Sequence, residues 1–173
     1  MKQVFALFTV VALFSLSVNH SDALAQPPDD RVFDGYTQYV DPDGGNQRHN
    51  MHACPDGFAM GGDHLHDNRI QCRRIPTLGK LDEPYVENGN QEEGMLACKD
   101  GYYAIGLHGE NTLLCQRSSD IRLGQHWTDS GTQEDNMHVC AQHPGGPIQV
   151  MIGMHEGRNL RRCAPIIGWK LPS

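Results

Sequence analysis

A threefold internal repeat marked by cysteines constrains the fold of this chain more than any other sequence feature. The six cysteines of the 173 residues form three sequential pairs. The first cysteine of a pair recurs after 98 − 54 = 44 and then after 140 − 98 = 42 residues. Each of these cysteines ends a related segment, and the segments read GNQRHNMHAC (45–54), GNQEEGMLAC (89–98) and GTQEDNMHVC (131–140). Such a period indicates repeats that share one core, because a single unit of this size cannot bury its own apolar face.

The similarity continues on both sides of these segments. An aromatic residue and, two positions later, an acidic residue precede each one, in YVD (39–41), YVE (85–87) and WTD (127–129). Each downstream segment has the skeleton Gly, any residue, His, two or three residues, Asn, three residues, Cys, and the copies read GDHLHDNRIQC (62–72), GLHGENTLLC (106–115) and GMHEGRNLRRC (153–163). Agreement at so many fixed offsets indicates three true repeats.

The third copy carries an insertion. The distance from its first cysteine to the shared histidine is 155 − 140 = 15 residues, whereas the other copies have 64 − 54 = 10 and 108 − 98 = 10. The inserted stretch includes HPGGP (143–147). Loops that differ on a shared scaffold often carry function, so this loop is a candidate functional element.

The apolar pattern within a copy predicts short β-strands. Apolar residues come in brief runs separated by turn signals such as Asp56-Gly57 and Asp100-Gly101, without the three- and four-residue spacing of a helix. We therefore predict an all-β domain of three pseudo-symmetric repeats of about 42–44 residues, β-prism-like or β-trefoil-like and stapled by disulfides. The predicted repeats span about residues 39–75, 85–117 and 127–166.

The N-terminal segment has the features of a secretory signal peptide. Lys2 precedes an apolar run from Val4 to Val18, and Ala23-Leu24-Ala25 has the small-residue pattern of a cleavage site. We expect residues 1–25 to be removed and residues 26–173 to form a single secreted or periplasmic domain. The apolar run is too short to span a bilayer comfortably, so we expect no membrane span. The net charge of −7 argues against binding to nucleic acid.

The cysteines predict disulfides, because six cysteines in a small exported chain usually pair. Repeat symmetry leaves two simple patterns. Each copy closes on itself (54–72, 98–115, 140–163), or each copy joins the next in a ring (72–98, 115–140, 163–54). We favour the first, in which closing each loop stabilises the fold by about 3 kcal/mol. Metal ligation by cysteine is the alternative, but the chain has no CxxC motif and no CxxCH motif for haem.

Three histidines recur at one position of the repeat, and they are His64, His108 and His155. One interpretation makes each a turn-stabilising residue next to the shared asparagine. The other brings the three imidazoles together around a pseudo-threefold axis as a site for Zn²⁺ or Cu²⁺. A residue that is kept in every copy of a repeat more often serves folding than function. The structural interpretation is therefore favoured.

Two further histidines, His52 and His138, share a second repeat position, where the middle copy has Leu96. Leucine at this position shows that the repeat folds without a histidine there. His52 and His138 are therefore either metal ligands or side chains exposed beside the cysteine strand.

Aromatic residues begin each copy, and these are Tyr39, Tyr85 and Trp127. Their recurrence predicts a core position first and a platform for stacking sugar rings second. The acidic residues that follow them, Asp41, Glu87 and Asp129, are candidates for the carboxylate pair of a glycoside hydrolase. They lie in turn-rich polar segments, which favours solvated loops, and no catalytic or nucleotide-binding motif is present. We assign no catalytic residue and expect no nucleotide cofactor.

These observations favour a secreted binding protein rather than an enzyme. The first expected partner is a transition metal, Cu or Zn, held by His64, His108 and His155 or by His52 and His138. The alternative is a glycan stacked on Trp127, Tyr85 or Tyr39, or a structural role in the cell envelope or the extracellular space. The sequence gives no indication of the oligomeric state.

Overall fold

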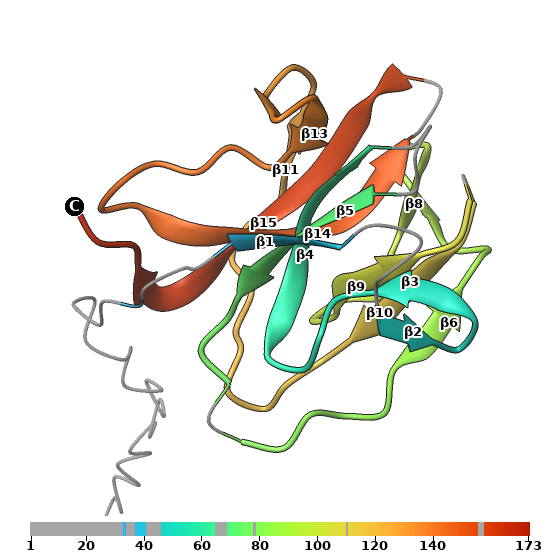
Figure 1. Cartoon of the computed structure of the whole chain (residues 1–173), viewed down its shortest axis with the longest axis horizontal. Helices are drawn as coiled ribbons and strands as arrows, with labels where there is room; N and C mark the ends of the chain where they lie inside the picture. The colour runs from blue at the N-terminus through green and yellow to red at the C-terminus, as the bar shows by residue number, and fades with distance from the viewer. Residues whose placement is uncertain are drawn as a thin grey trace, which may run out of the picture.

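The structure is a computed structural model that describes residues 33, 37–40, 46–64, 69–77, 79–109, 111–155 and 158–173. Within these residues the regular elements are all β-strands (Figure 1), which confirms the predicted all-β class. The described residues include no helix long and apolar enough to cross a membrane. The predicted signal peptide lies outside the described residues.

In the described part of the chain, each repeat contributes five strands. Those of the first repeat are β1 (Thr37–Val40), β2 (Asn46–Arg48), β3 (Met51–Ala53), β4 (Phe58–His64) and β5 (Arg69–Arg74). Those of the second are β6 (Tyr85–Glu87), β7 (Gln91–Glu92), β8 (Met95–Ala97), β9 (Tyr103–Leu107) and β10 (Leu113–Gln116). Those of the third are β11 (Trp127–Asp129), β12 (Gln133–Glu134), β13 (Met137–Val139), β14 (Pro147–His155) and β15 (Leu160–Lys170).

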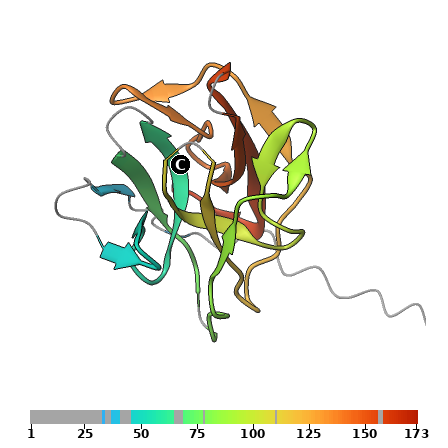
Figure 2. The same ribbon diagram turned by 90° about the vertical axis from the view of Figure 1, so that its right-hand side faces the viewer.

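The strands form three antiparallel sheets, and each sheet combines three strands of one repeat with a hairpin of another. The strand orders are β1-β5-β4-β13-β12 in the first sheet, β6-β10-β9-β3-β2 in the second and β11-β15-β14-β8-β7 in the third. Each hairpin thus joins the sheet of the next repeat, and the hairpin of the last repeat joins the first sheet. This cyclic exchange is compatible with the predicted pseudo-threefold arrangement, and Figure 2 shows the strands of the three repeats around a common centre.

The hairpin turns explain part of the repeated sequence. The two central residues of each turn have positive φ, and the pairs are His49 and Asn50 (53° and 60°), Glu93 and Gly94 (53° and 76°), and Asp135 and Asn136 (48° and 64°). Two consecutive positive φ angles define the type I′ turn, which matches the twist of paired strands and favours Asn or Gly at its second position. The Asn or Gly before each repeated methionine is therefore a turn residue.

The glycine of the Gly-x-His skeleton allows the hairpin strand of another repeat to lie close to the backbone. A Cβ at Gly62, Gly106 or Gly153 would lie only 2.3 to 2.6 Å from a carbonyl oxygen of the incoming hairpin strand. The residues that carry these carbonyls are His138, His52 and Leu96. Any larger side chain would push the hairpin away, so the sequence keeps glycine at this position.

The disulfides follow the favoured pattern within each copy, Cys54–Cys72, Cys98–Cys115 and Cys140–Cys163. The first cysteine of each pair follows an exchanged hairpin, and the second lies in a central strand of its own repeat. Each disulfide therefore joins two different sheets, and together they connect the three sheets in a ring. Three disulfides are compatible with an extracellular or periplasmic location.

The core has two clusters of buried side chains. One contains all six cysteines together with residues such as Met60 and Leu107. The other brings Ala59, Ile105 and Val150 together, one from a central strand of each sheet. The three repeated methionines, Met51, Met95 and Met137, are at most 3% exposed and belong to the core.

Candidate functional site

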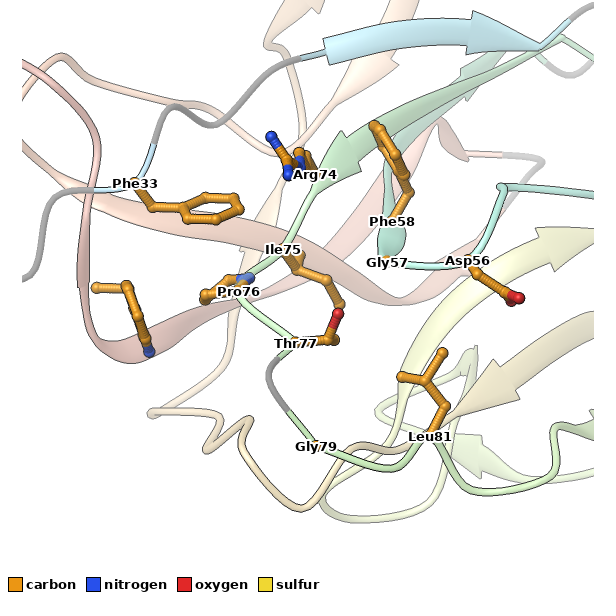
Figure 3. Close-up of a pocket in the computed structure, with 11 residues that line it drawn as sticks. Phe33, Asp56, Gly57, Phe58, Arg74, Ile75, Pro76, Thr77, Gly79 and Leu81 are labelled. Atoms are coloured by element: carbon orange, nitrogen blue, oxygen red, sulfur yellow. The ribbon is translucent and has the colours of Figure 1, made fainter.

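A cleft of about 590 Å³ lies where the first and third repeats meet. One side is formed by Asp56 and Gly57 in the turn before β4 and by Phe58, the first residue of β4. The segment after β5 forms the next side. Phe33, which precedes β1, and Trp169, which lies in β15, complete the lining. Figure 3 shows Phe33 and Phe58 on either side of Ile75, with Arg74 above Ile75. The cleft therefore combines aromatic rings from distant parts of the chain.

The aromatic side of the cleft is held by specific contacts. Phe33 packs edge to face on Trp169, with ring centroids 6.0 Å apart. The amide N–H of Phe33 donates a hydrogen bond of 2.9 Å to the carbonyl oxygen of Lys170, so Phe33 is attached to the end of β15. The guanidinium of Arg74 lies 5.5 Å from the centroid of the Phe33 ring, within the range of a cation–π contact. These contacts order the rings before a ligand arrives.

Polar groups border the same cleft. The carboxylate of Asp56 forms an ion pair of 2.9 Å with Arg48, and its side chain is 75% exposed. A hydrogen bond of 2.9 Å from the amide of Ile75 to the carbonyl oxygen of Gly57 fixes the turn against the segment after β5. The cleft thus offers apolar faces together with an accessible carboxylate and a guanidinium.

His138 and His64, two of the histidines predicted as metal ligands, lie beside a buried ion pair. His138 on β13 is paired in register with Asp63 on β4, which is fully buried and bridges to Arg161 on β15. The Arg161 Nη2 donates a hydrogen bond of 2.8 Å to Asp63 Oδ2. Burial raises the pKa of Asp63 to about 6, against the opposing effects of Arg161 and His64. Burial and the positive charges of Arg161 and His64 lower the pKa of His138, which favours its neutral form.

The other predicted metal ligands are distributed over the molecule. His52 pairs in register with Leu107 in the second sheet, while His108 follows β9 and His155 ends β14. Within the described ranges, no three or more His, Cys, Asp or Glu side chains are grouped as ligands for a metal ion. Binding of Cu or Zn by the repeated histidines stays a prediction.

The aromatic residues that begin the repeats have different surroundings. Trp127 is 36% exposed, and its Nε1 donates a hydrogen bond of 3.2 Å to Gln149 Oε1. Tyr85 is half-buried and packs edge to face on Tyr102 at 5.1 Å. Tyr39 lies in β1, but its side chain is outside the described part of the structure. Trp127 and Tyr85 are not among the residues that line the cleft, and glycan stacking on Trp127, Tyr85 or Tyr39 stays a prediction.

The predicted acidic residues stabilise turns. Asp129 accepts backbone hydrogen bonds from Gly131, Thr132 and Ala141, at 2.9 to 3.1 Å. Burial acts to raise the pKa of Asp129, but these donors outweigh it and lower the pKa. Glu87 accepts equivalent bonds from the amides of residues 89 and 90, and its pKa is lowered for the same reason. The carboxylates of Glu87 and Asp129 are thus occupied by backbone donors, and Asp41 lies outside the described residues.

Sequence reasoning missed Phe33 and Phe58 as members of a site. Phe33 precedes the first repeat, so no internal comparison points to it. Phe58 follows Asp56-Gly57, just as Tyr102 follows Asp100-Gly101, and this shared motif was the available signal. Read only as a turn, the motif did not reveal that it also places an aromatic ring in a cleft.

Comparison with known proteins gives no relative: no family model matches the chain, and neither a curated protein nor a solved structure is significantly similar to it.

Proposed function

We propose that this protein is a secreted, non-enzymatic carbohydrate-binding protein and that the aromatic cleft holds the sugar. The observation that carries this proposal is a cleft lined by the packed pair of Phe33 and Trp169, by Phe58 and by exposed Asp56. Sugar rings have apolar C–H faces that stack on aromatic rings and hydroxyl groups that need hydrogen-bond partners. A cleft of about 590 Å³ lies within the range of small-molecule sites.

The same lining supports binding rather than hydrolysis. Glycoside hydrolysis normally uses two carboxyl groups placed on either side of the scissile bond. Among the residues named as lining the cleft, Asp56 is the only one with a carboxyl group. Asp56 is therefore assigned the role of a hydrogen-bond acceptor for sugar hydroxyls.

The chain's two tryptophans provide the test. In a W127F variant Trp169 is the only tryptophan, so its fluorescence reports the aromatic cleft while an oligosaccharide panel is titrated. We expect at least one sugar to change this signal saturably. Phe58→Ala in the same background should weaken binding by about 30-fold, the effect of removing a central aromatic anchor.

A matched control separates loss of the site from loss of the fold. Val86→Ala removes an exposed apolar side chain on β6, and Val86 is not among the residues lining the cleft. It should leave sugar binding unchanged. If no sugar on the panel alters Trp169 fluorescence or binds in calorimetry, the proposed function is wrong.

A further inference from the structure

A second cleft, of about 220 Å³, is built on the same motif in the second repeat. Its turn contains Asp100, Gly101 and Tyr102, which match Asp56, Gly57 and Phe58 of the first cleft. The two glycines have nearly equal φ angles, 81° for Gly57 and 79° for Gly101. In both turns the aromatic residue donates its amide to the carbonyl three residues earlier, at 3.1 Å for Phe58 and 2.9 Å for Tyr102. The two turns therefore have the same local structure.

One further residue of each lining is equivalent, a leucine in the segment that leads into the next repeat. Leu81 lines the first cleft and lies 85 − 81 = 4 residues before the first residue of β6. Leu123 lines the second cleft and lies 127 − 123 = 4 residues before the first residue of β11. Both clefts thus lie between the turn of one repeat and the segment that leads into the next. This recurrence is independent of the aromatic contacts in the first cleft.

The second cleft is more polar than the first, and a buried arginine organises it. Arg162 on β15 is 3% exposed and pairs with the carboxylate of Glu92. Its Nη2 lies 2.6 Å from Nε2 of His126. Because a guanidinium carries only donors, His126 Nε2 is the acceptor in this contact. Glu92 and His126 both line the cleft, so Arg162 fixes the donor and acceptor positions on this wall.

Further groups on the lining complete a site for hydroxyl groups. Lys99, Asp100 and Tyr102 also line the cleft, and they bring an ammonium group, a carboxylate and a phenol to it. The Lys99 ammonium lies 4.7 Å from the centroid of the Tyr85 ring, and the Arg117 guanidinium lies 5.3 Å from that of Tyr102. Charges of both signs line this small volume, which suits a neutral ligand with many hydroxyl groups better than an anion or a cation. A single sugar ring has this chemistry.

At the equivalent position the third repeat has a different sequence, HPGGP (143–147). The inserted loop of the third repeat is bonded to the C-terminal segment, with Gly145 N–H donating to the Pro172 carbonyl at 3.0 Å. The Leu171 N–H donates in turn to the Gly146 carbonyl at 2.8 Å. The loop predicted as a functional element is thus bonded to the end of the chain.

We propose that the second cleft is a separate binding site for one sugar unit, which makes the protein bivalent for carbohydrate. The ligand class rests on the proposed function, whereas the existence of the site rests on the repeated turn and on Arg162. Two sites on one rigid scaffold raise the avidity for a glycan chain or a glycan-coated surface above the affinity of either site alone. Bivalency would explain why the D-G-aromatic turn occurs in two repeats.

The test uses one matched substitution in each cleft, Asp100→Asn and Asp56→Asn. Binding of panel sugars to the full mature chain is followed by amide chemical shifts and by calorimetric stoichiometry. For the wild-type protein we expect two sites, with shifts at residues 99–102 and 126 in the second. Asp100→Asn should weaken this site by roughly tenfold or more, as expected for the loss of a charged hydrogen bond. It should leave the Trp169 response of the W127F background unchanged, and Asp56→Asn should give the reverse result.

A second variant protects the test against simple unfolding. In His126→Gln the amide oxygen still accepts from Arg162, so the fold should persist while the position of the ligand donor changes. Absence of shifts at residues 99–102 and 126 with every sugar overturns the second site, whether or not Trp169 responds. Shifts there without any Trp169 response overturn the aromatic cleft as the sugar site and leave the second site standing.

Discussion

The junction between the third and first repeats differs from the junction between the first and second in both connection and chemistry. The chain runs directly from the first repeat to the second, whereas the third and first repeats stand at opposite ends of the described chain. At the closing junction, by which we mean the contact between the third and first repeats, Asp63 pairs with Arg161. The equivalent residues between the first and second repeats are Leu107 and Ile70, and both belong to the apolar core.

Two more polar contacts occur at the closing junction. The amide Nε2 of Gln71 donates to Glu134 at 2.7 Å, and the Nη1 of Arg73 donates to the Gln149 carbonyl at 2.9 Å. Gln71 and Arg73 are at most 1% exposed. Buried polar groups contribute little net stability, but they penalise arrangements that leave them unpaired. Of these two junctions, the one without a direct chain link is the one that holds buried polar partners, and the junction between the second and third repeats has one such pair, Arg162 with Glu92.

The largest expected effect comes from breaking the buried ion pair on one side only. Arg161→Leu leaves the Asp63 carboxyl buried without its counterion, which should lower the free energy of unfolding by about 3–5 kcal/mol. The double variant Asp63→Leu/Arg161→Leu copies the second repeat, where Leu107 and Leu113 occupy these positions. It should recover all of the loss or exceed the wild type. Urea unfolding with the disulfides intact measures all three proteins.

The matched control for this prediction lies at another junction. Leu113→Met conserves volume at the position equivalent to Arg161 and should cost less than about 1.5 kcal/mol. A double variant no more stable than Arg161→Leu would show that the ion pair itself, rather than avoidance of an unpaired charge, holds the closing junction.

The sequence predicted features that each repeat carries within itself. The favoured cysteine pairing and the all-β class rest on offsets and apolar patterns that recur inside the copies. The exchange of hairpins between repeats could not be predicted from the sequence, because no residue near Met51 or Met137 indicates which sheet their strands join. The pair of Asp63 and Arg161 is separated by 98 residues, and both replace residues that are apolar in other copies. The aromatic cleft depends on Phe33, which precedes the repeats, so only the assembled fold brings it to Trp169.

Removal of single disulfides tests whether the closing junction also depends on its covalent staple. Cys140→Ala/Cys163→Ala opens a loop with a sequence separation of 23, and Cys54→Ala/Cys72→Ala opens one of 18. The chain-entropy model predicts a loss of about 3 kcal/mol for each pair, because the loss varies only slowly with loop length. Denaturant unfolding of both variants provides the comparison. A much larger loss for the first pair would show that the staple, and not the polar contacts, closes the ring.

The smallest expected effect is a pH-dependent change in the free energy of unfolding, and it comes from His138. Because the pKa of His138 is lowered in the folded protein, the unfolded chain binds its proton more readily. The stability contribution of His138 is therefore complete above the unfolded pKa of about 6.5 and is lost as the pH falls through the lower folded value. His138→Leu copies Leu96 of the middle repeat and should differ from the wild type by less than about 1 kcal/mol at pH 8. As the pH falls from 6.5 to 5, the free energy of unfolding of the variant should rise relative to that of the wild type. Asp63 is present in both proteins, so its titration contributes to both stability curves. Parallel thermal unfolding curves at the two pH values would contradict this account and would place His138 in an environment no different from that of an exposed histidine.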